Sequence, residues 1–127
     1  MRFKTYLLEA IRDNRKTVTR RLVRTTECPY KVGNIYSATN RPRWTAARTK
    51  SNSNGGWFSV PIKIVDIRHE TLLDINEDDA RREGMLRQDN LSARERFFWT
   101  WGAIHGFDGQ NPDVWRIEFK PVPESWK

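Results

Sequence analysis

The chain has 127 residues, 37% of them hydrophobic and 12% aromatic, which supports one domain with a single core and argues against two domains. Its only cysteine excludes an internal disulfide, and its two histidines fit no zinc motif. No apolar run approaches the ~20 residues of a membrane span. We therefore expect one cytoplasmic domain over residues 1–127, with no metal, no other cofactor, no membrane association and no obligate protein partner.

The formal net charge of +7 is unevenly distributed along the chain. Residues 1–50 carry 13 Lys and Arg against 3 Asp and Glu, whereas residues 51–127 carry 10 against 13. The first part is therefore the expected anion-facing side. Such an asymmetry favours a polyanionic partner, most simply nucleic acid, without distinguishing RNA from DNA.

The first predicted elements are a short strand at residues 2–4 and an amphipathic helix at residues 5–13, whose apolar residues recur at helical spacing. Asp13-Asn14 has the composition of a turn. The β-branched run at residues 17–19 then predicts an extended segment.

The segment from Arg12 to Arg21 holds five cations and two threonines. Side chains alternate across a strand, so Thr19 and Arg21 share one face, while Val18 and Arg20 share the other, with Val18 toward the core. Like charges lower the pKa of a lysine, which makes Lys16 a candidate for a neutral amine that activates a threonine. The alternative is a solvated cationic face that contacts nucleic acid without sequence preference.

A turn at Gly33 predicts that another strand follows directly. Residues 40–56 have no hydrophobic period and are rich in Arg, Ser, Asn and Gly, so we expect a long basic loop insertion. Its cations and aromatic residue have the composition of a surface that binds phosphates and stacks a base; these are Arg41, Arg43, Trp44 and Arg48. The alternative is a solvated loop that binds nothing.

The remaining elements carry clear boundary signals. Residues 57–68 alternate as a strand, and Asn76 is a good N-cap for a helix that Gly84 ends. A capping box of Ser92 and Glu95 opens a second helix, whose aromatic stripe we interpret as core. Residues 114–120 alternate as a last strand.

The run N-R-K-T-V-T-R-R at residues 14–21 resembles the signature of the ASCH domain family: a glycine, one residue, a lysine, four residues and an arginine. Lys16 and Arg21 match the signature, and Asn14 stands where the glycine is expected, a common substitute at a positive-φ turn. The segment D-A-R-R-E-G-M at residues 79–85 is similar to a second family segment, which contains a glutamate. The resemblance implies an α+β fold, a PUA-like β-barrel of five to six strands with flanking helices.

Among ASCH proteins, the small bacterial amidohydrolases of N4-acetylcytidine use a lysine and a threonine three residues apart, together with that glutamate. By this resemblance, Lys16 is the general base, Thr19 the nucleophile and Glu83 the proton donor. Arg21, Asn14 and Arg15 are then expected at the substrate, and Arg20 at a nucleic acid. The alternative function is an RNA-binding or ribonuclease-like ASCH module without amidohydrolase activity. The expected ligand is a nucleoside or single-stranded RNA.

Overall fold

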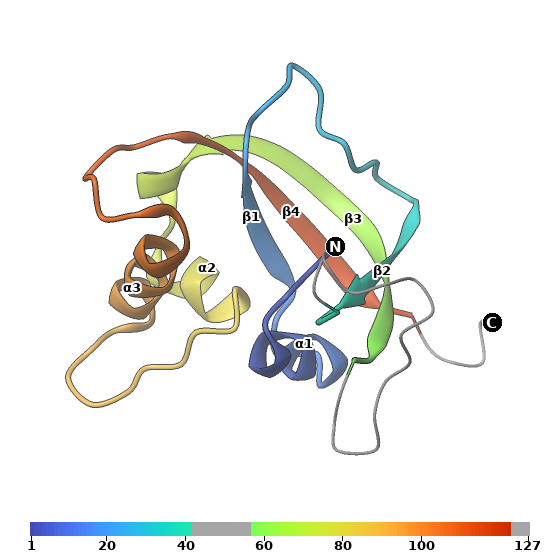
Figure 1. Cartoon of the computed structure of the whole chain (residues 1–127), viewed down its shortest axis with the longest axis horizontal. Coiled ribbons are helices and arrows are strands. Elements are labelled where there is room, and N and C mark those ends of the chain that lie inside the picture. Colours follow the sequence, from blue (N-terminus) through green and yellow to red (C-terminus); the bar gives the residue numbers. More distant parts are fainter. Residues whose placement is uncertain (42–56, 123–127) are drawn as a thin grey trace.

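The structure is a computed structural model that describes residues 1–41 and 57–122 (Figure 1). Its elements, in chain order, are α1 (Thr5–Arg12), β1 (Val18–Leu22), β2 (Ile35–Thr39), β3 (Ser59–Thr71), the 3-10 turn η1 (Leu72–Asp74), α2 (Glu77–Arg82), α3 (Ala93–His105) and β4 (Asp113–Pro121). The predicted helices and strands are thus present, apart from the strand at residues 2–4.

The described strands form one antiparallel sheet in the order β1-β4-β3-β2. The α+β class is confirmed, but the prediction of five or six strands closed into a barrel is wrong for the described residues. Residues 2–4 contribute only a single bridge, between Arg2 and Thr39. Residues 23–34, which include Pro29 and Gly33, run as loop and turns. The sheet therefore stays open, with β1 and β2 at its two edges.

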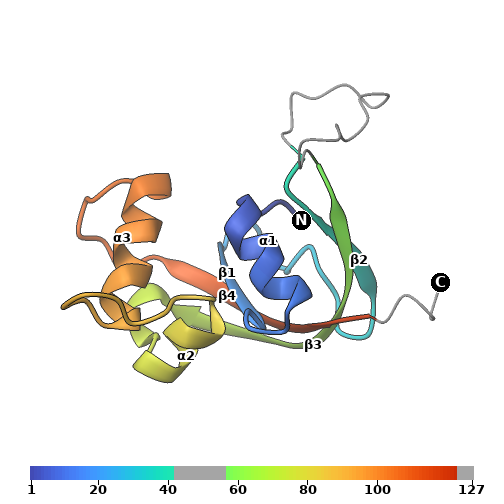
Figure 2. The same ribbon diagram turned by 90° about the horizontal axis from the view of Figure 1, so that it is seen from below.

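The sheet curves around α1, which lies on its concave face (Figure 2). Leu8 and Ile11 of α1 are fully buried there, against a core that includes Ile64 and Ile117 of the sheet. A β-bulge between Ile64 and Asp66 interrupts the register of β3 with β4. Bulges increase local bending and twist, which helps a 13-residue strand to follow this curve.

Helices α2 and α3 pack against each other (Figure 1), and Gly84, which follows α2, lies close to Leu7 of α1. As predicted, Asn76 caps α2 by accepting a hydrogen bond from the Asp79 amide, and Ser92 and Glu95 form the capping box of α3. Among residues 1–41 and 57–122, none of the helices has the length and apolar character needed to cross a membrane.

Candidate functional site: a cationic cleft with a buried lysine–glutamate pair

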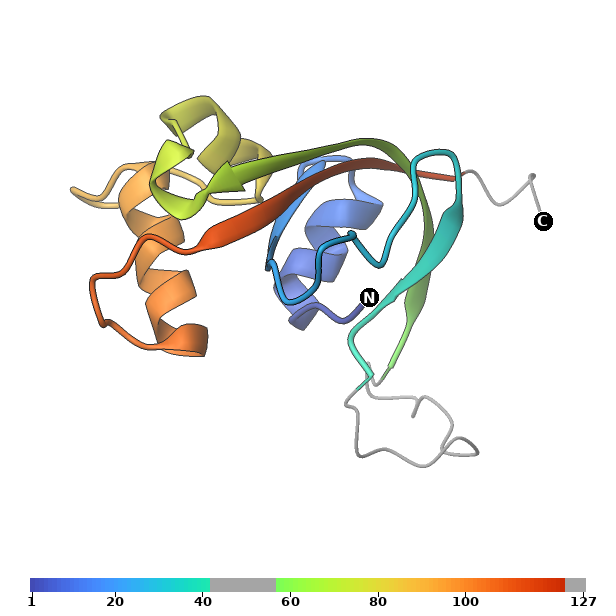
Figure 3. The same cartoon turned by 90° about the horizontal axis from the view of Figure 1, so that it is seen from above.

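A cleft of about 950 Å³ lies between the N-terminal segment, β1, α3 and the residues that follow β2. The connection between β1 and β2 (Figure 3) contributes Arg24, Pro29 and Tyr30 to the lining. Four of the predicted site residues line the cleft together; they are Lys16, Thr19, Arg21 and Glu83. These four residues therefore meet in one cleft beside the edge strand β1.

Lys16 is the largest fully buried side chain of the described residues, with 1% of its surface exposed. Its ammonium nitrogen donates to the carbonyl oxygens of Val18 at 2.7 Å and Glu83 at 2.8 Å. It also donates to the Glu83 carboxylate, at 3.1 Å from Oε1. Two carbonyl oxygens and one carboxylate oxygen thus accept hydrogen bonds from all three N–H groups of a charged lysine.

The backbone of β1 explains why a lysine fits at this position. Phe119 of β4 donates to the carbonyl of Thr17, so alternate residues of β1 bond to β4 and the carbonyl of Val18 points to the free edge. Lys16 satisfies that carbonyl from the turn before the strand. Glu83, the C-cap of α2, therefore lies along the free edge of β1.

The pKa of Lys16 is lowered from its usual range, as the sequence predicted, but the main cause is different. Burial away from water is the largest effect, and the cations Arg21 and Arg20 add to it. The Glu83 carboxylate opposes the shift by attracting the ammonium. Lys16 therefore loses its proton more readily than an exposed lysine does.

Thr19 and Arg21 extend from the same strand into the cleft. Thr19 is buried, and its hydroxyl makes no hydrogen bond to another described residue. The Arg21 guanidinium stacks on Phe3 at 4.8 Å and donates through Nη2 to the Arg2 carbonyl at 3.0 Å. Arg21 Nε is buried without a hydrogen-bond partner within residues 1–41 and 57–122.

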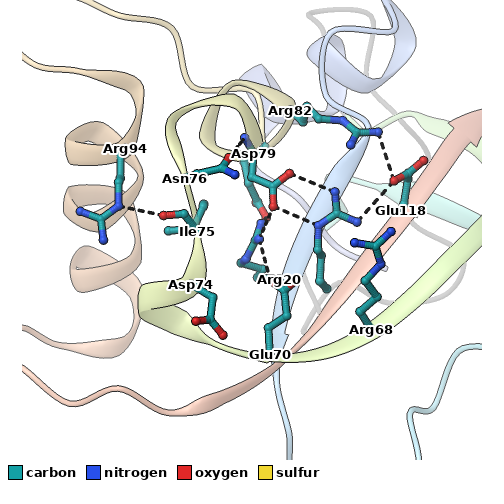
Figure 4. Close-up of polar contacts among 12 residues, drawn as sticks. Arg20, Arg68, Glu70, Asp74, Ile75, Asn76, Asp79, Arg82, Arg94 and Glu118 are labelled. Carbon is teal, nitrogen blue, oxygen red and sulfur yellow. Dashed lines mark hydrogen bonds and ion pairs between the residues drawn. The ribbon is translucent and has the colours of Figure 1, made fainter.

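The second oxygen of Glu83 is held by Arg20, whose Nη1 lies 3.2 Å from Oε2. The Arg20 side chain is fully buried and also reaches Glu70 at 3.1 Å and Asp79 at 2.7 Å (Figure 4). This placement corrects the expectation that Arg20 contacts nucleic acid, because the side chain is fully buried and both of its Nη atoms bind carboxylates. Arg20 instead fixes the orientation of Glu83.

The sheet separates the apolar core from a charged cluster on its other face. Thr19 pairs with Ile117, which belongs to the main core, whereas Arg20 pairs with Arg116. Two arginines side by side repel each other, and Asp79 of α2 compensates by accepting hydrogen bonds from both. Val18 shares the face of Arg20 and is fully buried there, outside the main core cluster, so alternation indicates burial on this face but not the carboxylates that bind Arg20.

Other predicted site residues lie elsewhere. Asn14 has a φ of 60°, as expected for a residue that replaces a turn glycine, but it is exposed and does not line the cleft. Arg15 is also exposed, pairs with Asp13 at 3.5 Å and stays outside the cleft. The expected substrate contacts of Asn14 and Arg15 are therefore not supported by the geometry.

The predicted phosphate-binding loop falls partly outside the described residues. Arg41 is described and lines the cleft. Arg43, Trp44 and Arg48 lie outside the described residues.

Sequence reasoning missed the aromatic lining of the cleft. The aromatic stripe on α3, which the sequence predicts to be core, also lines the cleft through Phe97, Trp101 and Ile104, and Ile104 is 56% exposed. Tyr30 adds an aromatic side chain from the connection between β1 and β2, and His105 stacks on Trp101 at 4.2 Å. In the described part of the chain, no group of three or more His, Cys, Asp or Glu side chains is arranged to hold a metal ion.

Gly84 places Glu83 beside Lys16, and its replacement should disturb this contact. Its φ is +100°, and an added Cβ would lie 3.3 Å from Leu7 Cδ2 and 3.4 Å from Lys16 Cβ. We expect Gly84→Ala to lower the free energy of unfolding by more than the about 1–2 kcal/mol of backbone strain alone. Urea unfolding measures it. Gly33→Ala is the control, since φ is +90° there and the methyl group would meet open space. Equal losses in both variants would show that the contacts at Gly84 are unimportant.

Comparisons with known proteins identify the fold. No family model matches the sequence, and no curated protein matches it. Among solved structures, the ASCH domain from Lactobacillus crispatus JV V101 is similar with a TM-score of 0.53 and 17% identity, over 91% of this chain and 69% of that one. A DUF984 protein from Enterococcus faecalis V583 is similar with a TM-score of 0.56 and 16% identity, over 91% and 66% of the two chains. At such identities the likeness concerns the fold alone.

Proposed function

We propose that this chain, which has the fold of ASCH domains, acts on a nucleoside or RNA and hydrolyses the amide of N4-acylated cytidine. The observation that supports this most strongly is the buried Lys16–Glu83 pair, which lies with Thr19 in one cleft. The two residues are 67 positions apart in sequence. A base and an acid in contact, in a cleft that a hydroxyl also lines, are the groups that acyl transfer requires.

In the proposed reaction, the Thr19 hydroxyl oxygen attacks the acyl carbonyl carbon, and its proton passes to the neutral amine of Lys16. Arg21, with its unpartnered Nε, stabilises the oxyanion that forms. The bond from carbon to N4 then breaks as Glu83 gives a proton to the leaving amine. Water hydrolyses the acyl ester of Thr19, which yields the carboxylic acid and restores the hydroxyl.

The hydrogen bond between Lys16 and Glu83 suggests how both groups reach their reactive forms. The Lys16 nitrogen lies 3.1 Å from Oε1 of Glu83. Transfer of one proton along this bond leaves a neutral amine and a carboxylic acid, the forms that a base and a proton donor need. The lowered pKa of Lys16 supports this step.

A second candidate function is RNA binding without hydrolysis. It is favoured by the resting geometry of Lys16, whose three protons all have acceptors, so that the lysine acts as a fixed charge. In that case, the Lys16–Glu83 pair only stabilises the edge of β1.

The hydrolytic function is tested by incubating the protein with N4-acetylcytidine and separating the products by chromatography. We expect cytidine and acetate. Thr19→Ser should retain turnover because it keeps a hydroxyl, whereas Thr19→Val, of the same shape, should lose at least about 10³-fold. Absence of turnover on N4-acetylcytidine and its close acyl analogues, or equal rates in wild type and Thr19→Val, would contradict the proposal and leave RNA binding.

A further inference from the structure

The cleft carries more positive charge than its catalytic residues need. Lys16 and Arg20 are both paired with Glu83, the only acidic residue among the described lining. The other cations that line the cleft have no carboxylate within ion-pair distance in the described ranges; they are Arg2, Lys4, Arg21, Arg24 and Arg41. An anionic ligand would balance this excess.

Arg41 is the best-placed of these cations to bind an anion. It is half-buried beyond the end of β2, where its backbone amide donates to the Thr39 hydroxyl at 3.1 Å. Its Nη2 is buried and has no hydrogen-bond partner among residues 1–41 and 57–122. A buried guanidinium nitrogen without an acceptor is unfavourable, and a ligand oxygen would supply the missing bond.

Two titratable groups near the cleft respond to its positive potential. The pKa of His105 is lowered, first by burial and then by Arg24 and Arg21. The pKa of the Met1 amine is lowered by burial, followed by Arg21 and Arg2. Both shifts have the direction that an excess of cations produces.

The size and lining of the cleft also suit a ligand larger than a nucleoside. Its volume of about 950 Å³ is near the upper end of the ~300–1,000 Å³ typical of ligand pockets. Burial decreases from Lys16 and Glu83 through half-buried Arg41 to exposed Arg24. Tyr30 and Trp101 lie among the lining and offer ring faces to a base.

We infer that the cleft contains a phosphate-binding subsite built on Arg41 and Arg24, so that its ligand is a phosphorylated nucleoside. Arginine binds phosphate oxygens through charge-assisted hydrogen bonds, often in pairs. The inference rests on the proposed function for the nucleoside part of the ligand only. The phosphate belongs either to a free nucleotide or to an RNA strand.

Calorimetric titration of the whole chain with cytidine and with cytidine 5′-monophosphate (CMP) tests the subsite. We expect CMP to bind about tenfold more tightly, which Arg41→Ala and Arg24→Ala should each reduce to less than about threefold while keeping the affinity for cytidine. Arg15→Ala removes the same charge outside the cleft and should keep the full preference. Thermal unfolding checks that each variant is folded, and Arg41→Lys, which keeps the charge, should retain part of the preference.

Equal binding of cytidine and CMP, a CMP preference that survives both Arg→Ala changes, or no binding of either compound would overturn the inference.

A short oligocytidine without a terminal phosphate shows whether the phosphate belongs to a free nucleotide or to an RNA strand. Tighter binding of the oligonucleotide than of CMP, dependent on Arg41, indicates an RNA strand; the reverse indicates a free nucleotide. The compounds carry no acyl group, so a CMP preference without hydrolysis of N4-acetylcytidine refutes the proposed function alone. Hydrolysis without a CMP preference refutes the subsite alone.

Discussion

Replacing Arg20 with methionine should lower the free energy of unfolding by about 3–5 kcal/mol, because it removes the buried cation that one buried and two partly buried carboxylates share. Glu70, Asp79 and Glu83 all lie within 3.2 Å of the Arg20 guanidinium. Since domains are stable by only about 5–15 kcal/mol, the loss is a large part of the total. Urea unfolding at neutral pH measures it.

The matched control is Arg68→Met, which removes an arginine that is 62% exposed and pairs with Asp66 at 2.8 Å. An exposed pair of this kind contributes at most about 1 kcal/mol, so this variant should stay close to the wild type. A similar small change in Arg20→Met would show that the buried cluster does not stabilise the fold.

Acid should narrow the difference between the wild type and Arg20→Met. Hydrogen bonds from Arg116 and Arg20 lower the pKa of Asp79 to about 2 in the folded chain, although partial burial opposes the shift. Because this pKa is lower than the usual 3.8, the ionised group contributes stability above about pH 4, and the contribution is lost as the pH falls through about 2. In Arg20→Met, Asp79 keeps Arg116 but loses the hydrogen bond from Arg20, so its protonation removes less stability than in the wild type. The difference in the free energy of unfolding between the wild type and Arg20→Met should therefore decrease as the pH is lowered from 7 to 3.

The second large effect is expected from Lys16→Arg, which should lower turnover of N4-acetylcytidine by at least about 10²-fold, because arginine keeps the charge and cannot serve as a base. Binding of the ligand should change much less, since the positive potential is retained. Steady-state kinetics and calorimetric titration on the same preparation measure the two quantities. Full turnover in Lys16→Arg would exclude the base role and favour Lys16 as a fixed charge.

The packing around Lys16 requires a second variant. Lys16 is buried against Gly84, and the larger arginine could strain the site at a cost of about 1–3 kcal/mol. Lys16→Met has a similar length without a charge and should also be inactive. The pH profile adds an independent test: the Lys16–Glu83 pair must keep one proton for the leaving amine, so wild-type turnover should fall as the pH rises through the lowered pKa of Lys16, below 10.5. In Lys16→Met the residual rate should lack this fall.

Local sequence signals were sufficient for the elements and for part of the site. Helix boundaries depend on residues within one turn, so the caps at Asn76 and Ser92 could be predicted from the sequence. The turn at Asn14 is likewise a local property. Lys16 and Thr19 are three residues apart across the turn and the start of β1, and both line one cleft.

Only the tertiary structure decided which charges are occupied and which remain available. Whether Arg20 faces solvent or carboxylates depends on α2 packing against the face of β1 that carries Arg20, and no signal within β1 contains that partner. The position of Glu83 against Lys16 likewise depends on the path of the chain over 67 residues. A closed barrel would need residues 2–4 and 23–34 to pair as strands. Among the described residues these segments form only one β-bridge, between Arg2 and Thr39, so the sheet stays open. Local composition determined the helices, strands and turns because their hydrogen bonds join near neighbours, whereas burial and ion pairing are set by contacts between distant parts of the chain.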